Sequence, residues 1–83
     1  MEASSQITIK AVWDSEAKVW VAESEDVPGL VTEAESAEAL LAKLRVLIPE
    51  LLEVNECLPV GQKFVDVLIH YYREDRTTLP VAA

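Results

Sequence analysis

Hydrophobic and polar residues change their spacing three times along this chain of 83 residues, and each change predicts a new element. From Ile7 to Asp14 apolar and polar side chains alternate, which is the period of a strand with one buried face. Lys18–Glu25 is rich in valine and tryptophan and predicts a second strand, joined to the first by the polar turn 14–17. Leu30–Ala34 predicts a short third strand.

A proline and a glycine mark the turn between the second and third predicted strands. Pro28 fixes φ at the first central position of a turn, and Gly29 supplies the positive φ that a type II turn needs at the second. Beyond the third strand, Ser36 is typical of a helix N-cap, because its hydroxyl oxygen can accept a hydrogen bond from a first-turn N–H. Glu38 then adds negative charge near the positive end of the helix dipole.

A stripe of leucine and isoleucine at helical spacing follows the predicted cap: Leu40, Leu41, Leu44, Leu47, Ile48, Leu51 and Leu52. Pro49 lies inside this stripe, and a proline in a helix interior costs about 3 kcal/mol and kinks or ends the helix. Because the stripe stays in phase across the proline, we favour one kinked helix that reaches about Asn55. Two short helices are the alternative.

The last predicted strand, Lys63–Tyr72, follows a loop over residues 55–62 and is apolar on both faces. One face holds Val65, Val67, Ile69 and Tyr71, and the other holds Phe64, Leu68 and Tyr72 beside Asp66 and His70. One helix cannot cover both sides of a four-stranded sheet. The sequence therefore predicts that Phe64, Leu68 and Tyr72 form an oligomer interface, which Val12 and Trp20 extend. Burial of both faces within the monomer is the alternative.

The order of these segments predicts an α+β fold, β-β-β-α-β, in which one helix packs on one face of an antiparallel sheet. The length predicts a single domain over residues 1–83, with its core at about 6–73. The residues are 51% hydrophobic, which is more apolar surface than so small a core readily buries. We therefore expect a homo-oligomer, a dimer or a tetramer.

Negative charge is concentrated in one part of the chain, whose formal net charge is −8. Positions 14 to 38 have a balance of −7, from Asp14, Glu16, Glu23, Glu25, Asp26, Glu33, Glu35 and Glu38 against Lys18. Such a surface disfavours direct contact with nucleic acid or an anionic membrane, because both require basic side chains. It suits a basic protein, and we expect Glu23, Glu25 and Asp26 to bind that partner. An acidic surface that only aids solubility is the alternative.

Reactive groups are few, so we expect no enzyme and no catalytic residue. The chain has one cysteine, Cys57, and one histidine, His70, and nothing else in the sequence completes a nucleophilic site around them. One histidine and one cysteine are too few for a zinc site, so no metal and no other cofactor is expected. Two glycines do not make a phosphate-binding loop. A single cysteine and the absence of a signal pattern or a membrane-length apolar run favour the cytoplasm.

The segment after the second predicted strand resembles a known family. Asp26, Pro28, Gly29, Thr32, Ser36, Ala39 and Leu40 match the pattern of HicB-like antitoxin domains. The segments 20–24, 26–30 and 48–52 resemble more narrowly a HicB-related family of small stand-alone domains of unknown function, and this match covers nearly the whole chain.

The resemblance implies a fold, a partner and a role. HicB-like domains are antiparallel sheets with one packed helix, a degenerate form of the double-stranded-RNA-binding or RNase H-like shape, and they form dimers or higher oligomers. HicB proteins bind and block HicA, a small basic ribonuclease toxin, and many bind their promoter through an added C-terminal DNA-reading module. Only residues 73–83 follow the last predicted strand, too few for such a module. We therefore expect a non-catalytic protein-binding module of the antitoxin type. An oligomeric scaffold or small-ligand-binding protein without a toxin partner is the alternative.

Overall fold

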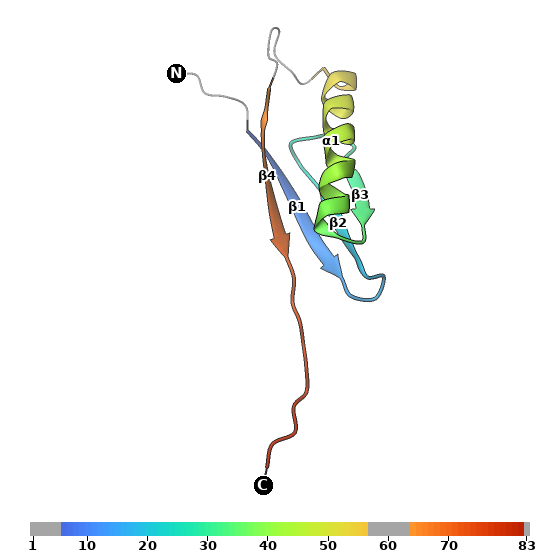
Figure 1. Ribbon diagram of the computed structural model, residues 1–83. Coiled ribbons are helices and arrows are strands. Elements are labelled where there is room, and N and C mark those ends of the chain that lie inside the picture. Colours follow the sequence, from blue (N-terminus) through green and yellow to red (C-terminus); the bar gives the residue numbers. More distant parts are fainter. Residues whose placement is uncertain (1–5, 57–63, 83) are drawn as a thin grey trace.

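The computed structural model describes residues 6–56 and 64–82 and has the predicted β-β-β-α-β order (Figure 1). Most of the predicted loop 55–62, with Cys57, lies outside the described residues. The α+β class and the four-stranded sheet with one packed helix are confirmed. The elements are β1 (Gln6–Asp14), β2 (Val19–Glu23), β3 (Val31–Ala34), α1 (Ala37–Val54) and β4 (Asp66–Tyr72).

The sheet has the strand order β3-β2-β1-β4, and its pairing is mixed. β2 pairs antiparallel with both β1 and β3, as expected, but β4 pairs parallel with β1. The prediction of a purely antiparallel sheet is therefore wrong for the last strand. The reason is the crossover: α1 leaves β3 at one edge of the sheet and returns the chain to the opposite edge, so β3 and β4 run in the same direction.

The predicted type II turn is confirmed and is tied to the end of the helix. The Leu30 N–H donates to the Val27 carbonyl oxygen at 3.1 Å, and Gly29 has a φ of +86°. Asn55 follows the helix, and its Nδ2 donates both to the Leu51 carbonyl oxygen at 2.8 Å and to the Pro28 carbonyl oxygen at 3.1 Å. One side chain therefore holds the last turn of α1 against the turn that leads into β3.

α1 begins as the sequence predicts and runs through its proline. Ser36 is the N-cap, and its hydroxyl oxygen accepts from the Ala39 N–H at 3.0 Å. The helix is continuous across Pro49, so one helix rather than two is confirmed. The kink expected at the proline stays a prediction.

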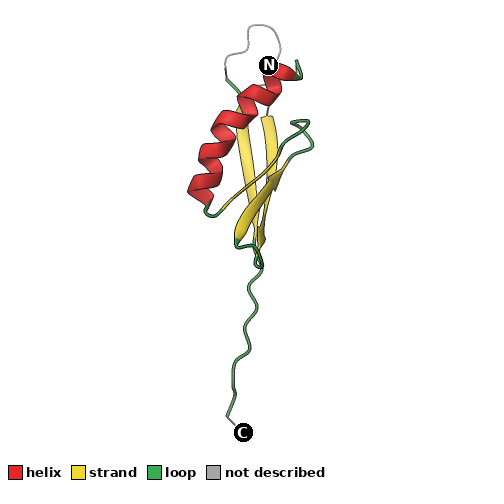
Figure 2. Ribbon diagram, turned by 90° about the vertical axis from the view of Figure 1, so that its right-hand side faces the viewer, coloured by secondary structure: helices red, strands yellow, loops and turns green. Residues whose placement is uncertain are grey.

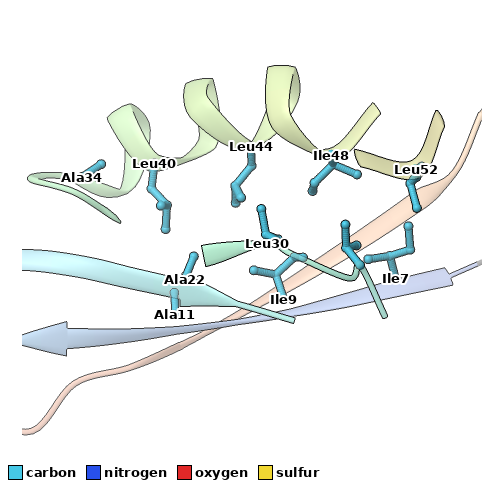
Figure 3. Close-up of a cluster of buried hydrophobic side chains, with 11 residues drawn as sticks. Ile7, Ile9, Ala11, Ala22, Leu30, Ala34, Leu40, Leu44, Ile48 and Leu52 are labelled. Carbon is cyan, nitrogen blue, oxygen red and sulfur yellow. The ribbon is translucent and has the colours of Figure 1, made fainter. Parts of the chain in front are cut away.

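The core lies between α1 and the sheet, and every fourth residue of the helix enters it (Figure 3). Leu40, Leu44, Ile48 and Leu52 are the buried helix residues. Below the start of the helix the sheet presents the small buried side chains of Ala11, Ala22 and Ala34, which leave room for Leu40 (Figure 3). Toward the other end of the helix, larger side chains fill the space: Ile7, Ile9, Val27 and Leu30.

The helix lies over β2 and β3 and leaves the β4 side of the sheet uncovered (Figure 1). Trp20 is directly opposite Trp13 and faces the helix side, where its ring meets those of Trp13 and Tyr71 in T-shaped contacts. The prediction that Trp20 extends the apolar patch on the open face is therefore wrong. Val12 does lie on that face, opposite Tyr72.

Beyond β4 the chain forms a C-terminal arm, residues 73–82, that extends away from the body of the protein (Figure 2). Every residue of the arm is exposed. The radius of gyration is 16.8 Å, whereas a compact domain of this length has a radius of gyration of about 12 Å. The arm therefore adds length to the molecule without adding to its core.

The turn at Gly29 generates a test of the fold. A Cβ added to Gly29 meets Leu51 Cδ2 at an ordinary 3.7 Å, so a substitution is opposed by the positive φ rather than by a clash with a neighbour. We expect Gly29→Val to lower the free energy of unfolding by at least about 1–2 kcal/mol, measured by urea denaturation. Gly29→Asn is the control, because asparagine tolerates a positive φ and loses less. A Gly29→Val variant of normal stability would contradict the turn.

Candidate functional site

The acidic segment after β2 is fixed to β1 by side chains that replace the hydrogen bonds of the sheet. The Ser24 hydroxyl donates to the Thr8 carbonyl oxygen at 2.7 Å and accepts from the Asp26 N–H at 3.0 Å. Asp26 Oδ2 accepts from the Thr8 N–H at 2.9 Å. The segment is therefore held against β1 where the regular pairing of β1 with β2 stops.

The three carboxylates predicted to bind a partner lie together at this point. Glu23, Glu25 and Asp26 line one open hollow of about 340 Å³, with Thr8, Lys10 and Ser24 as its other walls; we call it the acidic hollow. All three acidic side chains are exposed. Lys10, which is opposite Glu23 across the strands, is the one cation in this lining, so negative charge predominates.

The three acidic residues do not have equal roles. One oxygen of Asp26 is used to hold Thr8, so this residue shapes the acidic hollow as well as charging it. Glu23 projects from the open face of the sheet, and Glu25 lies in the connection that follows. Carboxylates placed in this way can accept hydrogen bonds from a guanidinium or ammonium group of a partner. The roles of Ser24 and Thr8 could not be predicted from the sequence, because their contacts join residues 16 and 18 positions apart.

The residues predicted for an oligomer interface lie on the open face of the sheet. Leu68 is opposite Thr8 and Tyr72 is opposite Val12, which places both side chains on the face away from α1. Phe64 precedes the strand and, by alternation, continues the same row. Phe64, Leu68 and Tyr72 are 86%, 44% and 53% exposed, so this row is accessible to a partner. That it binds a second copy stays a prediction.

A second apolar surface, which sequence analysis did not find, lies on the helix side of β4. It is a groove of about 310 Å³ between α1 and β4, and we call it the helix–β4 groove. Its lining comprises Leu41, Leu44, Arg45, Ile48, Pro49, Val65, Val67 and Ile69. The sequence indicated an apolar face on β4, but the groove exists only because the helix lies toward β3 and does not cover that face.

The remaining chemistry-bearing residues form no further site in the described part of the chain. His70 is exposed on the open face, opposite Lys10. Within residues 6–56 and 64–82, no three histidine, cysteine or acidic side chains are grouped so as to hold a metal ion. In the same ranges, no helix combines the length and the apolar character needed to cross a membrane.

Comparison with known proteins identifies the family of this chain. The family model described as a domain of unknown function, DUF1902, matches residues 6–81. This chain belongs to the DUF1902 family. A solved structure is similar to this DUF1902 domain as well, the hypothetical protein TTHA1013 from the extremely thermophilic bacterium Thermus thermophilus. It is 44% identical, the match covers 89% of this chain and 99% of that one, and the TM-score is 0.63. No curated protein matches the chain.

The two roles of Asp26 generate a test within this DUF1902 domain. We expect Asp26→Ala to lower the free energy of unfolding by about 1 kcal/mol, because the Thr8 N–H loses a charged acceptor. Glu25→Ala is the matched control, and we expect it to stay within about 0.5 kcal/mol of the parent protein in urea denaturation. Equal stability of the two variants would show that Asp26 does not hold this segment to β1.

The open-face row generates a second test. If the open-face row is an interface, the double change Phe64→Ser and Leu68→Ser reduces the assembly state seen in sedimentation velocity, because two exposed apolar side chains leave that contact. The control is Val46→Ser with Val54→Ser, which removes two exposed apolar side chains from the helix surface instead. An assembly state that does not change with the first pair would reject this row as the interface.

Proposed function

We propose that this protein is a non-catalytic binding module of the HicB antitoxin type, which binds and neutralises a small basic ribonuclease toxin resembling HicA. The observation on which the proposal depends is the acidic hollow, where Glu23, Glu25 and Asp26 line one accessible surface. The contacts of Ser24 and Asp26 with Thr8 fix this surface before a partner arrives. A partner therefore does not have to order the segment when it binds.

The charge of the whole chain supports the same choice of partner. The formal net charge is −8, and charge complementarity accelerates the encounter of an acidic protein with a basic one. A nucleic acid would meet the same surface with like charge. The RNA-binding surface of a basic ribonuclease is cationic, so a protein with an acidic hollow can cover that surface.

The resemblance to HicB-like domains supports the proposal through the same segment. Most matching positions have structural roles in this chain: Gly29 forms the type II turn, Ser36 caps α1, and Leu40 enters the core. Asp26 is the matching position that lines the acidic hollow. Most of the matching positions therefore support a HicB-like fold. Only Asp26 supports the proposed binding of a basic partner. A toxin of this type acts on RNA inside the cell, so the proposal includes a cytoplasmic location. HicB-like domains form dimers or higher oligomers, so the proposal also includes a homo-oligomeric assembly.

A second candidate function is an oligomeric scaffold without a toxin partner. It is favoured by the apolar side chains of β4, which are exposed on the open face and line a groove on the helix side. Self-association through these surfaces requires no acidic hollow, so the two functions differ in the residues that they need.

Charge reversal in the acidic hollow distinguishes the antitoxin function from the scaffold function. A small basic HicA-like ribonuclease, co-expressed with this chain, is expected to co-purify with it. We expect Glu23→Lys with Glu25→Lys to weaken the complex on the order of tenfold or more, measured by calorimetry on the purified proteins, because like charges then meet at the contact.

The control variant changes the net charge by the same amount elsewhere. Glu16→Lys with Glu53→Lys alters two exposed carboxylates outside the acidic hollow and should retain binding. Failure to co-purify, or equal weakening by both variants, would contradict the proposed site and favour the scaffold function.

A further inference from the structure

The C-terminal arm is a ten-residue extended segment whose side chains are all exposed. Its base is held in place, because the Arg73 guanidinium lies 4.9 Å from the centre of the Trp13 ring and Arg73 Nε is 3.0 Å from Asp75 Oδ1. Farther along, Leu79 is 72% exposed and Val81 is 88% exposed. An extended segment with exposed apolar side chains and no sheet pairing has the properties of a strand that lacks its neighbour.

The arm has one apolar side if its residues alternate as in a strand. Arg73 meets Trp13, which faces the helix side of the sheet, so Arg73 faces that side too. By alternation Leu79 and Val81 then share the face of Val67 and Ile69 on β4. Thr77 and Thr78 favour extended backbone, and Pro80 restricts its predecessor to the same region.

β4 offers an edge that suits such a strand. In the strand order β3-β2-β1-β4 it is the terminal strand, paired on one side with β1 (Figure 1). Its helix-side residues Val67 and Ile69 line the helix–β4 groove, whose other wall includes Leu41 and Pro49 of α1. An apolar edge strand of seven residues beside an apolar groove provides both backbone partners and a place for alternate side chains.

We propose that the arm of each copy pairs antiparallel with β4 of a second copy and inserts Leu79 and Val81 into the helix–β4 groove of that copy. Because β4 and the arm are continuous, one two-fold axis that places one arm on the partner's β4 also places the partner's arm on this β4. Ten extended residues span about 33 Å and seven span about 23 Å, so the arm is long enough to follow the whole strand.

The position of the helix–β4 groove determines the register in which the arm of one copy pairs with β4 of the other, and this register is set by the residue at which the two-fold axis crosses the strand. An axis through Glu74 places Leu79 opposite Ile69 and Val81 opposite Val67, the two β4 strand residues that line the helix–β4 groove. An axis one residue farther along would place Leu79 opposite Tyr71, which is outside the groove lining. An axis between residues would turn Leu79 and Val81 to the open face.

Charge agrees with the axis through Glu74. Arg73 of one copy then lies opposite the partner's Asp75, and the symmetric pair repeats on the other side of the axis. The two Glu74 residues face each other on the open face, and the repulsion between them is offset by the partner's Arg76, which is diagonal to each of them. The charged base of the arm therefore favours this pairing, and the apolar tip supplies the buried contact.

This assembly is independent of the proposed toxin partner, because it uses the edge and helix side of β4, whereas the acidic hollow is formed by β1 and the segment after β2.

The test starts from sedimentation velocity of the full chain over a dilution series, where a dimer is expected. Leu79→Ser with Val81→Ser should raise the dimer dissociation constant at least about a hundredfold. The control is Thr78→Ser with Ala82→Ser, which alters the other side of the arm and should leave the dimer dissociation constant unchanged. All four positions are in the exposed arm, so the fold of the body does not depend on them.

A cysteine at the axis tests the register. In a Cys57→Ser background, Glu74→Cys places the two engineered cysteines directly opposite each other, at a Cα separation that a disulfide can bridge. We expect a covalent dimer under mild oxidation. Thr77→Cys is the control, because its two copies would lie about six residues apart, roughly 20 Å, and should not cross-link.

Three results would overturn the proposal. The first is a parent protein that stays monomeric throughout the dilution series. The second is a dimer that survives Leu79→Ser with Val81→Ser, which would place the interface elsewhere, for example on the open-face row. The third is a failure of Glu74→Cys to cross-link while Thr77→Cys does so, which would exclude the antiparallel pairing about Glu74.

Discussion

One helix covers a sheet of four strands in this protein, and the position of that helix determines which surfaces stay open. The stripe of Leu40, Leu44, Ile48 and Leu52 lies over β3 and β2, and the small side chains of Ala11 and Ala22 face it in the core. Shifting the helix toward β4 would uncover β3 instead, because a helix is about 10 Å wide and four strands are about 15 Å across. The fold therefore closes a small core and leaves β4 as an apolar edge beside the helix–β4 groove.

The two candidate binding surfaces differ in chemistry and in place. The acidic hollow opens on the face away from α1, whereas the helix–β4 groove lies beside α1. The open-face row is a neighbour of the hollow, since Leu68 is directly opposite Thr8. Assembly through that row would therefore compete with a partner at the hollow. Assembly through the arm and the edge of β4 leaves the hollow accessible, so the same molecule can form a dimer and bind a basic protein.

Features that depend on neighbouring residues could be predicted from the sequence. The alternation from Ile7 to Trp13, the Pro28-Gly29 turn and the Ser36 cap each depend on a few adjacent side chains, and all three were confirmed. Features that depend on contacts between distant elements could not. The second strand is apolar at every position from Val19 to Ala22, so alternation alone did not show that Trp20 faces the helix. The parallel pairing of β4 and the groove both result from where the helix crosses the sheet.

In the candidate site, too, some features could be predicted from the sequence and others could not. Charge density pointed to Glu23, Glu25 and Asp26, and the structure brings them together around one hollow. The bracing of that hollow by Ser24, Asp26 and Thr8 spans 16 to 18 residues and has no local signal. The arm carries no periodic pattern long enough to predict a strand.

Amide hydrogen exchange of β4 shows whether the edge of this strand is completed by another copy of the chain. We expect those amides of Asp66–Tyr72 that do not pair with β1 to exchange fast at low protein concentration and to become protected as the concentration rises. The amides that pair β1 with β2 should be protected at every concentration. Exchange along β4 that is independent of concentration, whether fast or slow, would exclude pairing of this edge with another copy.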